Sequence, residues 1–189
     1  MPTAARMRAL GRRLAPMLRP GDLIVLNGPL GAGKTTLVQG IGEGLHVRGP
    51  VTSPTFVIAR VHPPLGGGPA LVHVDAYRLS SPAEVDDLDL DADLERSVTV
   101  VEWGGPLVEE LAPGWLEVTI TMPAAGLPAG LDAGLAAGGL AAGLAPAAGQ
   151  VPAGEPGEGD EPRTVLLTGR GERWAVAAES VLAGHDRLP

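Results

Sequence analysis

Residues 22–40 read DLIVLNGPLGAGKTTLVQG, and this stretch decides the fold. Its first part, residues 22–27, is a short apolar and β-branched run of the kind that forms a buried strand. A glycine-rich loop follows, and the helix predicted after it covers residues 34–45. The stretch therefore predicts a strand, a tight loop and a helix in direct succession.

The loop matches the pattern Gly-x-x-x-x-Gly-Lys-Ser/Thr in the required strand–loop–helix context. Its glycines let backbone N–H groups turn toward phosphates, and the N-terminus of the following helix adds positive potential. Lys34, the only lysine in the chain, would place a compact charge on the β- and γ-phosphates, while Thr35 would offer a hydroxyl to Mg²⁺. We therefore predict that the loop binds a nucleoside triphosphate, through Gly28, Gly31, Ala32, Gly33, Lys34, Thr35 and Thr36.

Two further strands end in an acidic residue. The run ALVHVD ends at Asp75, and the run VTVVE ends at Glu102. Hydrolysis of a nucleotide needs an acid near the metal, normally at the end of a strand beside the loop. At least one of the two is expected to contact Mg²⁺ or the attacking water, and the predicted catalytic residues are Lys34, Asp75 and Glu102.

The remaining pattern predicts an α/β fold, a single P-loop domain whose mostly parallel central sheet is flanked by helices. Met7, Leu10 and Leu14 have the spacing of an amphipathic first helix. A turn-rich connection between two strand candidates predicts a β-hairpin. The predicted strands after the loop are 55–62, 70–77, 97–103, 115–120 and 163–169, and the later predicted helices are 81–95 and 172–184.

The composition changes between residues 123 and 162, where there are no aromatic or basic residues but ten glycines. A glycine in every turn costs about 1 kcal/mol relative to alanine, so a helix is not expected there. We interpret 123–162 as a flexible low-complexity insertion, and 1–122 with 163–189 as the P-loop ATPase domain.

The charge balance limits the partners. Fourteen basic against 22 acidic side chains give a net charge of -8, which argues against coating DNA or RNA directly. There are no cysteines, so disulfides and thiolate metal sites are excluded. No apolar run approaches the roughly 20 residues of a membrane span, and the arginine-rich start lacks an apolar export region. We therefore expect a cytoplasmic protein with no membrane and no DNA partner.

The base of the nucleotide follows by elimination. The guanine-selecting motif Asn-Lys-x-Asp requires a second lysine, and the chain has only Lys34. A transporter-type Leu-Ser-Gly-Gly-Gln signature is also missing from the sequence. ATP is therefore the favoured nucleotide, with Mg²⁺ as its metal.

Four motifs in this order resemble the TsaE family: GPLGAGKTTLVQGIGEGL, TSPTF, HVDAYRL and VEWG. The resemblance covers residues 3–122 and, more weakly, 163–184, whereas 123–162 has no counterpart in the family pattern. It implies a slow ATPase needed to make threonylcarbamoyladenosine in tRNA. The protein partner would be a TsaB–TsaD type complex, so tRNA would be met only indirectly.

The resemblance also implies individual roles. Thr35 and Glu102 would be the magnesium ligands, and Asp75 would lie in a switch-like segment near the γ-phosphate. Ser53 and Thr55 would belong to a second mobile loop that senses the nucleotide. Arg163 and the segment 3–6 would lie near the adenine or ribose.

Other interpretations stay open on the residues alone. A small-molecule kinase would use the same loop, although a lid in 123–162 would lack arginine. A nucleotide-sensing subunit that does not hydrolyse ATP is a third possibility. The sequence alone does not decide whether Glu102 or Asp75 is the direct magnesium ligand. His73 shares a strand face with Asp75 and is interpreted as a core histidine.

Overall fold

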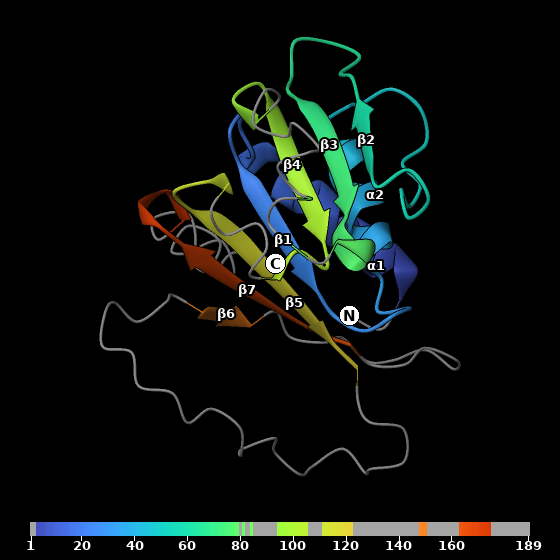
Figure 1. Cartoon of the computed structure of the whole chain (residues 1–189), viewed down its shortest axis with the longest axis vertical. Coiled ribbons are helices and arrows are strands. Elements are labelled where there is room, and N and C mark those ends of the chain that lie inside the picture. Colours follow the sequence, from blue (N-terminus) through green and yellow to red (C-terminus); the bar gives the residue numbers. More distant parts are fainter. Residues whose placement is uncertain are drawn as a thin grey trace, which may run out of the picture.

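A seven-stranded sheet forms the centre of the computed structural model (Figure 1). The structure describes residues 3–79, 81, 84, 94–105, 111–122, 148–150 and 163–174. The strands are β1 Leu23–Asn27, β2 Ala59–His62, β3 Ala70–Asp75, β4 Ser97–Glu102, β5 Trp115–Thr121, β6 Ala148–Gln150 and β7 Thr164–Arg170. The helices are α1 Ala4–Leu14 and α2 Lys34–Gly44, with short 3-10 helices η1 Ala15–Met17 and η2 Ala76–Arg78.

The strand order is β2-β3-β4-β1-β5-β7-β6. The four central strands β3, β4, β1 and β5 run parallel, and β2, β7 and β6 join antiparallel at the two sides. The predicted α/β fold with a mostly parallel sheet and a hairpin is therefore confirmed. Since parallel strands end at the same edge, the loop after β1 meets the ends of β3 and β4 there.

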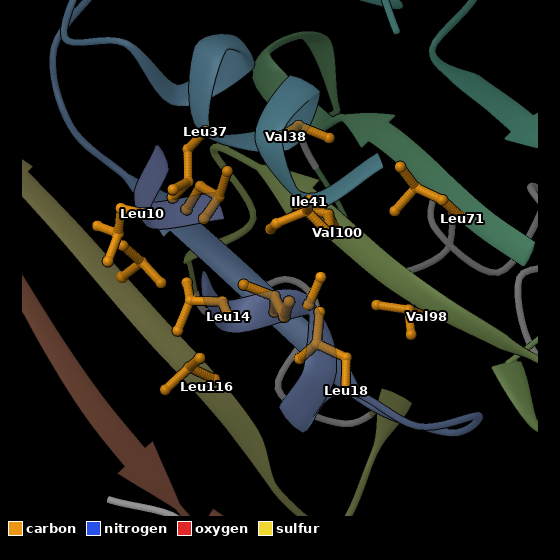
Figure 2. Close-up of a cluster of buried hydrophobic side chains, with 14 of the residues drawn as sticks. Leu10, Leu14, Leu18, Leu37, Val38, Ile41, Leu71, Val98, Val100 and Leu116 are labelled. Atoms are coloured by element: carbon orange, nitrogen blue, oxygen red, sulfur yellow. The ribbon is translucent and has the colours of Figure 1, made fainter. Parts of the chain in front are cut away.

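Helices α1 and α2 cover one face of the sheet (Figure 1). Leucines of α1 and apolar residues of α2 meet β-branched residues of the strands in one buried cluster (Figure 2). Leu10 and Leu14 lie on the buried side of α1, as their spacing predicts. Val98 and Val100 of β4 are fully buried beneath α2, because alternate residues of a strand share a face.

The two helices cross at backbone contact. A β-carbon at Gly40 of α2 would lie 2.0 Å from the carbonyl oxygen of Arg8, and one at Gly11 of α1 would lie 2.3 Å from that of Leu37. No other residue type fits at either position without moving a helix. Met7 of α1 also packs beside Gly33, so α1 supports the glycine-rich loop from behind.

Several predicted strand boundaries are wrong by one or more residues, and three of them have a clear cause in the structure. The strand predicted at 55–62 begins only at Ala59, because the amide groups of Val57 and Ile58 fold back on the carbonyl of Pro54. The strand predicted at 70–77 ends at Asp75, whose side chain accepts a hydrogen bond from the amide of Tyr77 and caps η2. The strand predicted at 97–103 ends one residue early, because Trp103 has a φ of 64°.

Some predictions fall largely outside the described residues. They are the helix at 81–95 and the closing helix at 172–184 beyond Trp174. Of the segment 123–162, the structure describes Ala148–Gln150, which form β6 against β7. No helix was expected in this segment, and these three residues instead pair as a strand, because β7 offers them a strand edge. Within the described residues, no helix combines the length and apolar character needed to cross a bilayer.

Candidate functional site

The predicted phosphate loop occupies the turn between β1 and α2. Gly28 has a φ of 150°, and a β-carbon there would lie 2.6 Å from the carbonyl oxygen of Ile120. Gly33 caps α2 with a left-handed φ of 102°, a conformation that favours glycine. All seven predicted loop residues lie in this turn or in the first turn of α2: Gly28, Gly31, Ala32, Gly33, Lys34, Thr35 and Thr36.

Lys34 is buried at the start of α2, with 5% of its surface exposed. Its ammonium donates hydrogen bonds to the carbonyls of Gly28 at 2.8 Å and Pro29 at 3.0 Å. The same nitrogen lies 3.6 Å from the ring centre of Trp103. Burial lowers the pKa of Lys34, and the negative charges of Glu102 and Asp75 oppose that shift. The cation is therefore held inside the loop next to two carboxylates.

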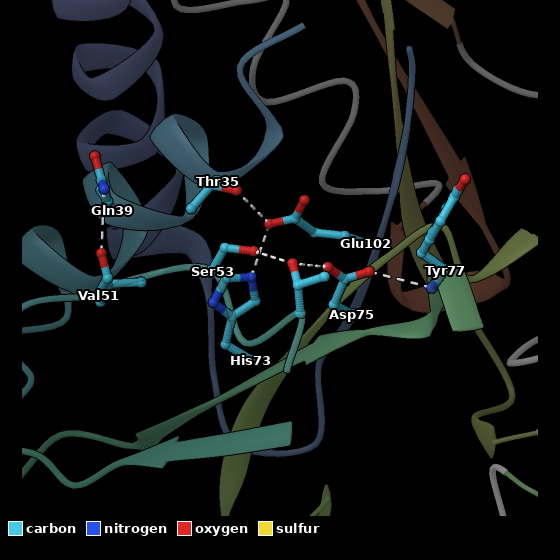
Figure 3. A network of polar contacts seen from close by, with 9 residues as sticks. Thr35, Gln39, Val51, Ser53, His73, Asp75, Tyr77 and Glu102 are labelled. Atoms are coloured by element: carbon cyan, nitrogen blue, oxygen red, sulfur yellow. Dashed lines mark hydrogen bonds and ion pairs between the residues drawn. The ribbon is translucent and has the colours of Figure 1, made fainter. Parts of the chain in front are cut away.

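Glu102 joins the loop to the sheet (Figure 3). Its Oε1 accepts a hydrogen bond from the hydroxyl of Thr35 at 2.9 Å and lies 2.9 Å from Nε2 of His73. Glu102 is 3% exposed and ends β4, directly beside Asp75 at the end of β3. The sheet register thus brings the two predicted acids together at the edge where the loop lies.

Asp75 connects the site to the loop before β2. Its Oδ2 accepts a hydrogen bond of 2.6 Å from the hydroxyl of Thr55, which in turn lies 2.7 Å from the hydroxyl of Ser53. Its Oδ1 accepts from the backbone amide of Tyr77 at 3.1 Å. These hydrogen bonds bring Ser53 and Thr55 next to Asp75. Figure 3 labels Ser53 and Asp75 of this network.

Arg163 is placed by β7, and the N-terminal segment is placed by the start of α1. Arg163 directly precedes β7, whose first residue Thr164 is paired with Thr121 at the end of β5. It therefore lies at the same sheet edge as the glycine-rich loop. Thr3 caps α1 by accepting a hydrogen bond from the amide of Arg6. Their predicted position near adenine or ribose stays a prediction.

Sequence reasoning missed two residues of the site. His73 is buried, as expected of a core histidine, and its contact with Glu102 was not foreseen. Trp103 covers Lys34 and also contacts Tyr77 edge to face, with ring centres 5.4 Å apart. The alternation of His73 with Asp75 on one strand face was the available signal for the first. The left-handed backbone of Trp103 has no signal in the sequence.

The donor set suits a hard cation. Thr35 and Glu102 offer a hydroxyl and a carboxylate oxygen that already touch each other, and Mg²⁺ prefers such oxygen ligands. Mg²⁺ is usually held by one or two protein groups together with substrate phosphates. Among the described residues there is no group of three or more His, Cys, Asp or Glu side chains that could hold a metal without a ligand. The residues present therefore fit a magnesium ion that arrives with a nucleotide.

A parallel sheet, a glycine-rich loop leading into a helix, and a buried lysine beside two strand-end acids define an α/β protein of the P-loop type. The chain belongs to the TsaE family: residues 1–126 match the family described as "Threonylcarbamoyl adenosine biosynthesis protein TsaE".

Similar proteins agree with this assignment. The "tRNA threonylcarbamoyladenosine biosynthesis protein TsaE" of Streptomyces coelicolor is 55% identical over 179 residues, covering 94% of this chain and 100% of the relative. The protein of the same name from Mycobacterium tuberculosis is 50% identical over 127 residues, covering 64% of this chain and 76% of the relative. Since the Streptomyces alignment spans 94% of the chain, it extends across 123–162, where no counterpart was expected.

A solved structure supports the fold. The crystal structure of Bacillus subtilis YdiB matches with a TM-score of 0.59 and 23% sequence identity, covering 99% of this chain and 93% of the YdiB chain. At this identity the match supports the arrangement of helices and strands alone.

Proposed function

We propose that this chain is a magnesium-dependent ATPase of tRNA threonylcarbamoyladenosine biosynthesis, which binds ATP at residues 28–36 and hydrolyses it slowly on its own. The observation that carries the proposal is the convergence of three side chains at one sheet edge. Lys34 is buried in the loop, and Thr35 is hydrogen-bonded to Glu102 at the end of β4. Family membership supports the biosynthetic role.

In this proposal the backbone N–H groups of the loop and the ammonium of Lys34 hold the phosphates. Thr35 and Glu102 hold the metal, which when bound neutralises the charge that develops on the phosphate oxygens. Asp75 orients the attacking water or senses the γ-phosphate. Because it also accepts the hydroxyl of Thr55, a change at the phosphate would be passed to the loop before β2.

The energy of ATP hydrolysis would be used by a protein partner of the TsaB–TsaD type, and this partner would bind the tRNA. The reaction is expected to take place in the cytoplasm. Two exposed rings lie on the segments next to Asp75: Phe56 is 88% exposed and Tyr77 is 67% exposed. Exposed aromatic groups of this kind are typical of protein contact surfaces. Their position beside the nucleotide-sensing residues supports a partner that reads the state of the site.

The test compares the wild-type chain with Lys34→Ala. We expect the variant to lose ATP binding by calorimetry and to release no phosphate, with or without partner proteins, while its circular dichroism spectrum is unchanged. Arg48→Ala is the matched control, because it removes an exposed cation just beyond the C-terminal end of α2. Unchanged ATP affinity in Lys34→Ala would refute the proposal, and phosphate transfer only to an added acceptor would favour a kinase.

A further inference from the structure

His73 is a fully buried polar side chain that the proposed hydrolysis leaves without a role. It lies on β3 with 0% of its surface exposed. Its Nε2 lies 2.9 Å from Oε1 of Glu102, as drawn in Figure 3. On the same sheet face its apolar neighbours are Leu71 of β3 and Val98 and Val100 of β4. The charged neighbours on that face are Asp75 and Glu102 on the side of the glycine-rich loop and Arg60 of β2 across the strand pair. The apolar neighbours alone would accept an aliphatic residue at this position.

Among the described residues, the buried ring of His73 makes a single hydrogen bond, to Glu102. Within the described part of the chain, Nδ1 of His73 has no hydrogen-bond partner. Since buried polar groups normally need at least one partner, Glu102 is the reason a histidine is tolerated here. An ionised carboxylate only accepts hydrogen bonds, so in this contact Nε2 carries the hydrogen and donates it.

The contact restricts Glu102 from a second direction. Oε1 of Glu102 receives the hydroxyl of Thr35 from α2 and the imidazole of His73 from β3. A glutamate has three rotatable side-chain bonds, and two donors from different elements leave it little freedom. Its other oxygen, Oε2, takes part in neither of these two contacts. The pair of donors therefore sets which carboxylate oxygen is available for a metal.

We propose that His73 is a positioning residue, which holds the Glu102 carboxylate in the orientation that binds magnesium. The inference rests on the proposed function, because it assigns a role to His73 only if Glu102 serves a metal. Hydrogen-bond partners behind metal ligands typically contribute about 10–100-fold to metal affinity. His73 acts through Glu102 and does not itself touch the nucleotide.

The experiment measures magnesium-dependent binding, not turnover. The probe is a fluorescent ADP carrying a methylanthraniloyl group, titrated with Mg²⁺ or with EDTA into wild type and His73→Leu. We expect His73→Leu to weaken Mg²⁺-supported binding by about 10–100-fold. Binding in EDTA should change by less than about twofold, because Lys34 and the loop are untouched. His73→Gln should regain most of the loss, since its amide nitrogen reaches the place of Nε2.

Two further variants separate positioning from packing. In a Glu102→Ala background, His73→Leu should change the magnesium dependence by less than about twofold, because no carboxylate remains to be held. If His73→Leu does not fold, the comparison of His73→Gln with His73→Asn decides, because the amide of asparagine is too short to reach Glu102. Gln should then support magnesium dependence and Asn should not. Thermal unfolding of each variant confirms that it is folded.

Three outcomes contradict the proposal, and they differ from one another. A wild-type magnesium dependence in His73→Leu would show that His73 only packs. An equal loss of binding with Mg²⁺ and with EDTA would show a general distortion of the loop. A wild-type chain whose ADP binding ignores Mg²⁺ would instead overturn the proposed metal, and the role of His73 with it.

Discussion

Lys34 combines burial with charge. Its ammonium is removed from water and compensated by two backbone carbonyls and by nearby carboxylates. The lowered pKa means that burial outweighs the attraction of Glu102 and Asp75. A residue that destabilises the fold in this way is typical of a binding site, where the charge is needed for a ligand.

We expect Lys34→Met to raise the melting temperature at pH 7 in the absence of nucleotide. Because the folded pKa of Lys34 lies below the ordinary value of 10.5, the unfolded chain binds more protons than the folded one as pH rises toward that value. As pH rises, the wild-type chain should therefore gain stability relative to Lys34→Met. The difference in melting temperature between the two proteins should shrink near pH 10.5. Scanning calorimetry of both proteins from pH 7 upward tests this. A variant that is less stable throughout would show that the carbonyl contacts dominate.

The two strand-end acids are expected to divide the work. Glu102 is held by Thr35, so Glu102→Ala should weaken magnesium-dependent ATP binding by about tenfold or more, or about 1.4 kcal/mol. Asp75 contacts the mobile-loop candidate Thr55, so Asp75→Ala should slow hydrolysis by about 100-fold and spare binding. Both changes should impair tRNA modification in cells.

The measurements for these two variants are ATP affinity with and without Mg²⁺, then single-turnover hydrolysis with the partner proteins. Asp75→Asn is the matched control, because it keeps an oxygen that can accept the amide of Tyr77. If Asp75→Ala lost the magnesium dependence and Glu102→Ala kept it, the assignment would be reversed.

At the residue scale the sequence predicted that Lys34 and the two acids lie close together, but not all of their contacts. The loop follows a spacing with a known physical cause, and the acids follow strands that end at the same edge of the sheet. The role of His73 depends on the register of β3 against β4, which places it diagonally from Glu102. A single sequence does not contain that register.

The helices α1 and α2 pack against each other and support the glycine-rich loop. Gly11 and Gly40 let the helices approach until backbone touches backbone. The helical spacing of Leu10 and Leu14 predicted the buried face of α1, but it did not predict its partner helix. Periodicity reports which side of a helix is apolar, whereas the choice of neighbour depends on shapes that meet only after folding.

We expect Gly40→Ala to destabilise the protein by about 1–3 kcal/mol, because its β-carbon would overlap the carbonyl oxygen of Arg8. The direction of the stability change identifies the cause, because glycine-to-alanine in an isolated helix stabilises the helix by about 1 kcal/mol. Gly67→Ala is the control, as a β-carbon there meets nothing within 4 Å. Urea denaturation of both variants provides the comparison. A Gly40→Ala variant as stable as wild type would mean that the helices can separate without cost.

For the whole molecule, β5 and β7 are antiparallel neighbours although more than forty residues separate them. Thr121 and Thr164, at their facing ends, are paired. The residues on either side of the intervening segment therefore lie next to each other. Composition predicted where this segment lies, because 123–162 lacks aromatic and basic residues. It did not predict Ala148–Gln150 as a strand, because pairing depends on the exposed edge of β7.

Deleting residues 124–160 should therefore preserve the fold and ATP binding. The shortened connection would be Met122-Pro123-Glu161-Pro162-Arg163, and hairpin loops of about 2–5 residues are common. The deletion removes β6 but leaves the seven residue pairs between β5 and β7. Thermal unfolding and ATP titration of the deleted chain are the measurements. A large fall in melting temperature would show that the segment packs on the domain.

The strand order also determines when each strand can pair while the chain is being synthesised on the ribosome. β1 is made early, but both of its neighbours, β4 and β5, come late, and β3 pairs with β4 instead. The loop at Gly28 rests on Ile120, one residue before β5 ends. A nascent chain that has passed Gly33 must grow through Thr121 before this loop has its support. At roughly 5–20 residues per second that takes on the order of 5–20 s. Until β4 is complete at Glu102, the apolar β1 also has no strand beside it, and exposed apolar segments of this kind are what chaperones bind.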